Sequence, residues 1–198
     1  MWFRAIAMGT PYAPALAMRS GLVFVFVVLA LRTAAAEPIV IGADVGVLHD
    51  QGQSDGSTLG AFVRMRVDRR AWAQFELGRI SLDQGGPSIR AAPGSSDVTQ
   101  TSGVLVADLG DGSVVPIAIA GVGLDFASNL VRDNTYLHGE VGAGLELRTG
   151  ALTLGIDVRL GTRTIAESSQ RDVLVYYEPR ILAEGTYTSG RVRLGLRF

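Results

Sequence analysis

The feature that most constrains the fold is a repeated alternation of apolar and other residues along most of the chain after about residue 38. Successive side chains of a β-strand point to opposite faces, so a period of two predicts strands whose two faces meet different surroundings. In 136–147, for example, Leu137, Val141 and Leu145 alternate with His138, Glu140 and Glu146. The chain also contains 25 glycines, which disfavour helices. The sequence therefore predicts an all-β protein.

Eight segments show this alternation, at about 39–48, 58–67, 71–80, 101–109, 114–126, 136–147, 152–160 and 191–198. The connections between them alternate in length. Short turns are expected near 68–70, 110–112 and 149–150, and Asp111-Gly112 is a strong hairpin signal. Longer polar stretches occupy 49–57, 82–100, 127–135 and 161–188. This asymmetry is typical of transmembrane barrels, which have tight turns at one end and longer loops at the other.

The first residues have the pattern of an export signal. Arg19 precedes an apolar run at 22–31, and Ala34, Ala35 and Ala36 provide small residues for cleavage. The apolar run is too short for a helix that crosses a membrane, which needs about 20 residues. We expect residues 1–36 to be a cleaved signal peptide and residues 37–198 to form one barrel domain.

The composition excludes several kinds of function. The chain has no cysteine, so disulfides and cysteine-based metal sites are excluded. Its basic residues are all arginines and form no basic block, so no nucleic-acid partner is expected. No carboxylate cluster has metal-ligand spacing, and no cofactor is predicted.

The alternation alone does not say which face of the barrel points outward. A lipocalin-like carrier turns its apolar face inward, whereas a membrane barrel turns it toward lipid. Glycines recur on the polar face, as a narrow interior requires. That face also carries acidic residues and arginines but no lysine, which suits planar guanidinium–carboxylate pairs inside a barrel. These features predict an apolar exterior in lipid.

The last alternating segment, Val192-Arg193-Leu194-Gly195-Leu196-Arg197-Phe198, looks like the C-terminal strand of bacterial outer-membrane proteins. With the export signal and eight segments, the chain resembles the small eight-stranded OmpA-type barrels. The resemblance implies a single antiparallel up-and-down transmembrane β-barrel in the bacterial outer membrane. It also implies contact with membrane lipid and with the barrel-assembly machinery, which would read Val192, Leu194, Leu196 and Phe198. Arg193 departs from the glycine usual at that position, and Phe75, Phe126 and Phe198 make only a thin aromatic girdle.

Side chains fill the interior of an eight-stranded barrel, and buried charges are costly unless they pair. The sequence therefore predicts a network of interior charges that plugs the barrel, with a narrow or gated ion path as the alternative. The partners within this network depend on strand register. His138 stands two residues from Glu140, with which it could form a His–carboxylate pair. The predicted network comprises Asp44, Arg64, Arg66, Glu76, His138, Glu140, Glu146, Asp157, Arg159, Arg191 and Arg193.

Two local motifs bear on catalysis. His49-Asp50 with Ser54 and Ser57 contains the residue types of a nucleophilic triad, but a real triad is defined by geometry. Barrel lipid A deacylases pair a histidine and a serine in one local motif. Ser128-Asn129 here has no adjacent histidine, so that motif is not matched. The sequence therefore favours a protein that is not an enzyme.

The connection at 161–188 is the candidate surface for a partner. Its segments 172–177 and 180–183 are suited to extending two strands above the membrane, with an exposed edge that could pair with a partner's strand. Alternatively, Tyr176 and Tyr177 pack at the membrane interface, or the segment adds strands to make ten. The leading prediction is a non-enzymatic surface protein that acts through its outer loops. A small channel, a soluble lipocalin-like carrier and a lipid-modifying enzyme are the alternatives.

Overall fold

The computed structural model of the protein describes residues 38–50, 54–82, 97–128, 132–170, 182 and 184–198. The predicted signal peptide, residues 1–36, lies outside them. No helix in the described part is long and apolar enough to cross a membrane. The strands are β1 (Ile39–Asp50), β2 (Ser54–Asp68), β3 (Ala71–Leu82), β4 (Asp97–Asp108), β5 (Val114–Ser128), β6 (Arg132–Thr149), β7 (Leu152–Gln170) and β8 (Gly185–Arg197).

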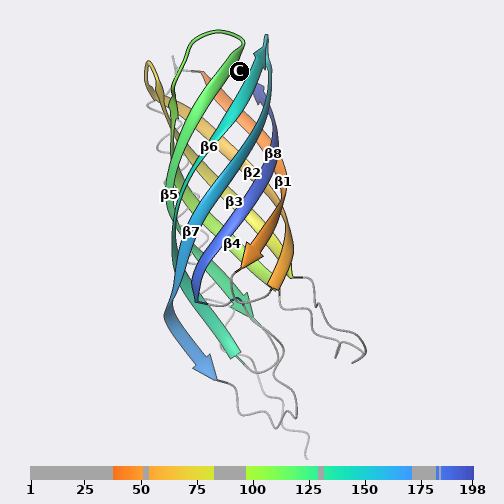
Figure 1. Ribbon diagram of the computed structural model, residues 1–198, viewed down its shortest axis with the longest axis vertical. Helices are drawn as coiled ribbons and strands as arrows, with labels where there is room; N and C mark the ends of the chain where they lie inside the picture. Colours follow the sequence, from red (N-terminus) through yellow and green to blue (C-terminus); the bar gives the residue numbers. More distant parts are fainter. Residues whose placement is uncertain (1–37, 51–53, 83–96, 129–131, 171–181, 183) are drawn as a thin grey trace, which may run out of the picture. The chain divides into compact units, whose positions relative to one another are not determined.

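The eight strands form one closed barrel in which each strand pairs with its neighbours in sequence. All of the pairings are antiparallel, and β8 closes the sheet on β1 with Val40 opposite Arg197 and Asp50 opposite Tyr187. Figure 1 shows the strands slanting around this barrel, with the C-terminus at the same end as the short connections. The predicted eight-stranded up-and-down barrel is confirmed.

The strands are longer than the sequence pattern predicts. β7 continues to Gln170, and β8 already begins at Gly185, so much of the stretch predicted as a loop at 161–188 is strand. Likewise, β1 continues to Asp50, and β2 already begins at Ser54. The hydrogen-bonded ladder continues past the apolar belt, where both faces are polar and the hydrophobic alternation disappears. The segments at 172–177 and 180–181, and residue 183, lie outside the described residues.

The apolar face points outward on most strands, whereas on β4 Val98, Val104 and Val106 point inward. Exposed side chains include Val47, with 67% of its surface accessible, Val122 with 66% and Leu160 with 62%. The alternate positions are buried and largely polar or charged, as at Arg64, Glu76 and Arg159. This distribution is the reverse of that in a lipocalin-like barrel, whose exterior meets water. The alternative of a soluble carrier is therefore wrong.

The apolar exterior forms a belt with a definite upper limit. On β7 the outward residues from Leu152 to Leu160 are all apolar, and Thr162 and Thr164 follow. On β1 the belt ends at Val47, before His49. Strands that cross a bilayer at a tilt need about 9–11 residues for the apolar region, which matches these segments. The belt therefore has the height of a membrane's hydrocarbon layer.

The two ends of the barrel differ. The end that holds the β2–β3, β4–β5 and β6–β7 connections is called the turn end here, and the opposite end the loop end. Two turn-end connections use glycine in the left-handed region, Gly112 with φ 113° and Gly150 with φ 57°, where a side chain would be strained. At the loop end β6 and β7 extend beyond the other strands, as the lower part of Figure 1 shows.

A charge placed in the middle of the belt should destabilise the barrel more than one placed above it. We expect Val141→Arg to reduce the free energy of unfolding in lipid vesicles by about 2–4 kcal/mol, and Thr164→Arg by about 0–1 kcal/mol. Denaturant titration of the vesicle-inserted protein, followed by the gel mobility of the folded form, measures both. Equal losses for the two variants would contradict the position of the belt.

Candidate functional site

The barrel interior gathers most of the predicted charge network. Inward positions recur at every second residue of each strand, so strands on all sides direct their polar side chains to one narrow space. The buried members have exposed fractions of 5% or less: Asp44, Arg64, Glu76, His138, Glu140, Glu146, Asp157, Arg159, Arg191 and Arg193. Arg66 is the exception, since it is only partly buried.

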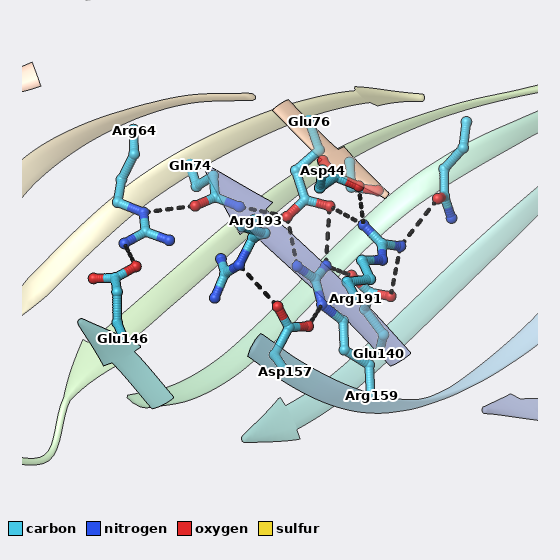
Figure 2. A network of polar contacts seen from close by, with 12 residues as sticks. Asp44, Arg64, Gln74, Glu76, Glu140, Glu146, Asp157, Arg159, Arg191 and Arg193 are labelled. Carbon is cyan, nitrogen blue, oxygen red and sulfur yellow. Dashed lines mark hydrogen bonds and ion pairs between the residues drawn. The ribbon is translucent and has the colours of Figure 1, made fainter. Parts of the chain in front are cut away.

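Arg159 lies at the centre of the network and binds three carboxylates from three strands. Its Nη2 and Nη1 donate to the two oxygens of Glu76 at 2.7 and 2.9 Å. Its Nε donates to Asp157 Oδ1 at 2.7 Å, and Nη1 also contacts Glu140. Figure 2 shows these carboxylates surrounding the guanidinium group. The planar fork of arginine suits such multiple pairing.

Two arginines of β8 complete this central group. Arg191 Nη1 lies 2.7 Å from Glu76 Oε2 and 4.0 Å from Asp44 Oδ1, while Nη2 donates to Gln100 Oε1 at 3.1 Å. Arg193 Nε lies 2.8 Å from Asp157 Oδ2. Glu76 therefore joins arginines of β7 and β8 across the interior, as Figure 2 shows. These ion pairs connect strands far apart in the sheet.

A second group lies toward the turn end. Arg64 donates from Nη1 to Glu146 Oε1 and from Nε to Gln74 Oε1, both at 2.6 Å. Arg148 donates to Glu146 Oε2 at 2.6 Å and binds both oxygens of Asp108 at 2.8 and 2.7 Å. The Glu146 carboxylate is thus held by two arginines from opposite sides.

The predicted ion pairing of Arg66 is not what the structure shows. Its guanidinium carbon lies 4.5 Å from the centre of the Trp72 ring, in a cation–π contact. Arg148 lies over the same ring at 5.5 Å, and Trp72 Nε1 donates to Asp108 at 3.0 Å. Arg66 is near the turn end and partly exposed, so it can remain charged without a buried carboxylate.

A third group lies toward the loop end around His138. The ring contacts Asp125 of β5 rather than the predicted Glu140, whose carboxylate is bound by Arg159 and Tyr187. His138 Nδ1 lies 3.0 Å from Asp125 Oδ1, and Nε2 lies 3.1 Å from Ser102 Oγ. Gly123 lies between Ser102 and His138 in the ladder, and a Cβ there would meet His138 Cε1 at 2.6 Å. The absence of a side chain at Gly123 lets the imidazole lie across β5.

Arg163 connects this group to residues of β1 and β8. Its Nε donates to Asp125 Oδ2 at 2.6 Å, its Nη1 lies 3.5 Å from Asp50 Oδ2, and it stacks over the Tyr187 ring at 4.4 Å. Tyr187 in turn donates to Glu140 Oε2 at 3.2 Å. Arg163 and Asp50 fall in stretches predicted as loops. Arg163 could have been found from the sequence, because it continues the series of inward positions 157, 159 and 161 beyond the apolar belt.

Apolar side chains occupy the interior as well, which the charge pattern does not reveal. One cluster contains Val40, Phe62, Trp72, Val104, Val106, Val115, Ile117 and Ile119. The other contains Leu48, Ile80, Val98, Ala127, Tyr136, Leu182 and Tyr187. The first lies mainly toward the turn end and the second at the loop end, so the three polar groups have apolar packing on both sides. The sequence of β5 did indicate apolar side chains in the interior, because Ile117 and Ile119 share the inward face with Asp125.

The residue types of a triad in the first loop do not assemble into a site. His49 points outward and pairs with Asp55 at 2.5 Å, whereas Asp50, its neighbour in β1, points inward and is buried. Adjacent residues of a strand face opposite sides of the sheet, so these two cannot act on one substrate. Ser102, His138 and Asp125 do stand in the order of a nucleophile, base and carboxylate, but they are 1%, 1% and 0% exposed. Within the described residues, no three potential metal ligands are grouped to hold an ion.

Comparison with known proteins supports the fold. No protein-family model matches the sequence, and no curated protein matches it. Among solved structures, Neisserial surface protein A superimposes with a TM-score of 0.54 at 13% identity, over 81% of this chain and 95% of that one. The attachment invasion locus protein Ail of Yersinia pestis gives a TM-score of 0.47 at 12% identity, over 82% and 97%.

Removing Arg159 should be far more costly than removing an exposed arginine. Arg159→Met leaves Glu76, Glu140 and Asp157 short of a buried partner, and we expect a loss of about 3–5 kcal/mol in the free energy of unfolding. Arg70→Met is the matched control, because Arg70 pairs with Asp111 at the surface, and it should cost about 0–1 kcal/mol. Denaturant titration in lipid vesicles measures both. A loss below 1 kcal/mol for Arg159→Met would show that the pairs contribute little.

Proposed function

Because this chain has the fold of the small outer-membrane β-barrels, we propose that it is a bacterial outer-membrane protein whose barrel is closed to solutes and whose loop end contacts a partner at the cell surface. The observation that carries the proposal is the reversed distribution of side chains, with an apolar belt outside and paired charges inside. Such a wall is stable in lipid, where a closed sheet leaves no backbone group unpaired. Membrane lipid surrounds the belt. Outward Val192, Leu194, Leu196 and Phe198 are the residues proposed to guide insertion by the barrel-assembly machinery.

The packing of the interior supports a closed barrel. The central group links Glu76 to Arg159 and Arg191 with contacts of 2.7–2.9 Å, and apolar clusters lie on both sides of the polar groups. A water-filled pore lined by these charges would need them to separate. Separation is expensive, because each buried charge would lose its partner before it regained full hydration.

The extension of β6 and β7 supports a role in surface contact. From Thr164 to Ser169 the side chains of β7 are all exposed. The backbone ladder that carries them includes the pairs Thr135–Glu167, Asn134–Ser168 and Asp133–Ser169 and ends at Arg132–Gln170. β8 pairs with β7 only as far as Arg163, opposite Gly185. Beyond Arg163, the edge of β7 that faces away from β6 is therefore suited to pairing with an added strand from a partner. The similar Neisserial structure is of a protein described as a surface protein.

The burial of Ser102, His138 and Asp125 favours a role without catalysis. A serine nucleophile must meet its substrate, but Ser102 is 1% exposed within a packed interior. Arg163 binds the second oxygen of Asp125, so the three residues belong to the structural network. Their hydrogen bonds hold β4, β5 and β6 together from inside.

A narrow ion path is the second candidate, because charges of both signs line the interior from Arg64 to Arg163. The two candidates differ in planar-bilayer recordings of the protein purified from membranes. A closed barrel gives no single-channel steps in concentrated KCl, and Glu76→Gln, if it folds, does not change that result. Resolved steps whose ion selectivity shifts in Glu76→Gln would favour the path instead. Heat-dependent gel mobility verifies that each sample is folded.

Surface contact is tested by shortening the extension of β6 and β7. Deleting residues 133–135 together with 167–169 removes three pairs between β6 and β7 and also the β6 partners of residues 126–128 on β5. We expect cells exporting this variant to lose most of their attachment to a protein-coated surface, relative to cells exporting the full chain. Replacing Asp133, Asn134, Thr135 and Glu167 by serine makes all six positions serine, keeps the length and separates shape from side-chain chemistry. Unchanged attachment at equal surface amounts would contradict a role for the extension.

A further inference from the structure

Two buried arginines have nitrogens that no described carboxylate uses. Arg64 Nη2 and both terminal nitrogens of Arg193 are buried and find no hydrogen-bond acceptor among the described residues. The two side chains are 1% and 2% exposed. Figure 2 shows their guanidinium groups pointing toward one another across the interior. Two cations therefore direct N–H groups to the same place.

The neighbouring carboxylates are already occupied. Glu146 Oε1 accepts from Arg64 Nη1 and its Oε2 accepts from Arg148. Asp157 divides its oxygens between Arg159 and the Nε of Arg193. Arg148 has its own carboxylate in Asp108, but Arg64 shares Glu146 with Arg148, and Arg193 shares Asp157 with Arg159. Neither Arg64 nor Arg193 therefore has a carboxylate to itself.

Beside these groups, the sheet is less crowded at Gly155 than at most of its inward glycines. Gly155 lies between Glu146 on β6 and Arg193 on β8 in the register of the sheet. A Cβ built at Gly155 would have only ordinary contacts, the nearest being Arg193 Nε at 3.6 Å and the carbonyl oxygen of Leu145 at 3.6 Å. Most inward glycines of the barrel are far more crowded, as at Gly144, where the nearest atom would be 2.3 Å away.

We propose that Arg64 and Arg193 bind a small monovalent anion of the halide class, such as chloride, inside the barrel beside Gly155. A halide accepts hydrogen bonds from several directions and would give a further partner to two arginines whose carboxylates are shared. A water molecule at the same place would need acceptors for its own hydrogens, whereas a halide needs only donors. This site is independent of the proposed surface contact.

Bromide is the probe that tests the site. The full chain is expressed with export, and the barrel is purified from membranes, crystallised in sodium bromide and measured at the bromine absorption edge. We expect an anomalous peak within hydrogen-bond distance of Arg64 Nη2 and at least one terminal nitrogen of Arg193. In Arg193→Met the peak should be lost, and in Arg70→Met, which removes an exposed arginine, it should remain.

The wild-type crystal decides the proposal even if Arg193→Met does not fold. Ordered water between the two arginines, with no anomalous signal, would overturn it. Bromide bound only at exposed arginines would be an adventitious ion only and would overturn it as well. A peak that persisted in folded Arg193→Met would show that Arg193 does not hold the anion, which also contradicts the site.

Discussion

The pairing of every strand with two neighbours is the constraint on which the rest of the structure depends. An apolar belt in lipid cannot leave backbone N–H and C=O groups unpaired, so the sheet must close, and here β8 closes it on β1. Eight strands enclose a space that side chains fill. Closure therefore decides both that the interior is narrow and that whatever faces inward is buried.

Burial in that narrow space determines how the charges are arranged. Each buried carboxylate of the central group is bound by arginine, and Arg159 alone contacts Glu76, Glu140 and Asp157. Ion pairs of this kind compensate for lost hydration rather than add much stability of their own, so breaking one is costlier than its net contribution suggests. The pairs also connect strands that are not neighbours in the sheet. The apolar clusters around Trp72 and Tyr187 fill the interior space that the charged side chains do not occupy.

A barrel held together by its hydrogen-bonded sheet and by its interior contacts leaves the loop end as the part of the molecule available for contact. The ladder between β6 and β7 continues beyond the belt to Gln170, where side chains no longer face lipid on one side and the charge network on the other. Polar residues such as Glu167 and Ser168 are free to serve recognition there without affecting the barrel. In the proposed function, the barrel is therefore a rigid support for the extension of β6 and β7. The proposed anion between Arg64 and Arg193 would complete its interior.

The sequence by itself determined the architecture and the sidedness of the strands. The alternation of Trp72, Gln74 and Glu76 with Ala73, Phe75 and Leu77 places each residue inside or outside, because the period of a strand is local. It did not determine that His138 meets Asp125 and Ser102, or that Arg163 reaches Asp50. Strands distant in sequence choose these partners through register and barrel closure, and Gly123 permits one of them by lacking a side chain. Only the tertiary structure decided the pairs, because a residue's face follows from its own strand while its partner follows from all of them.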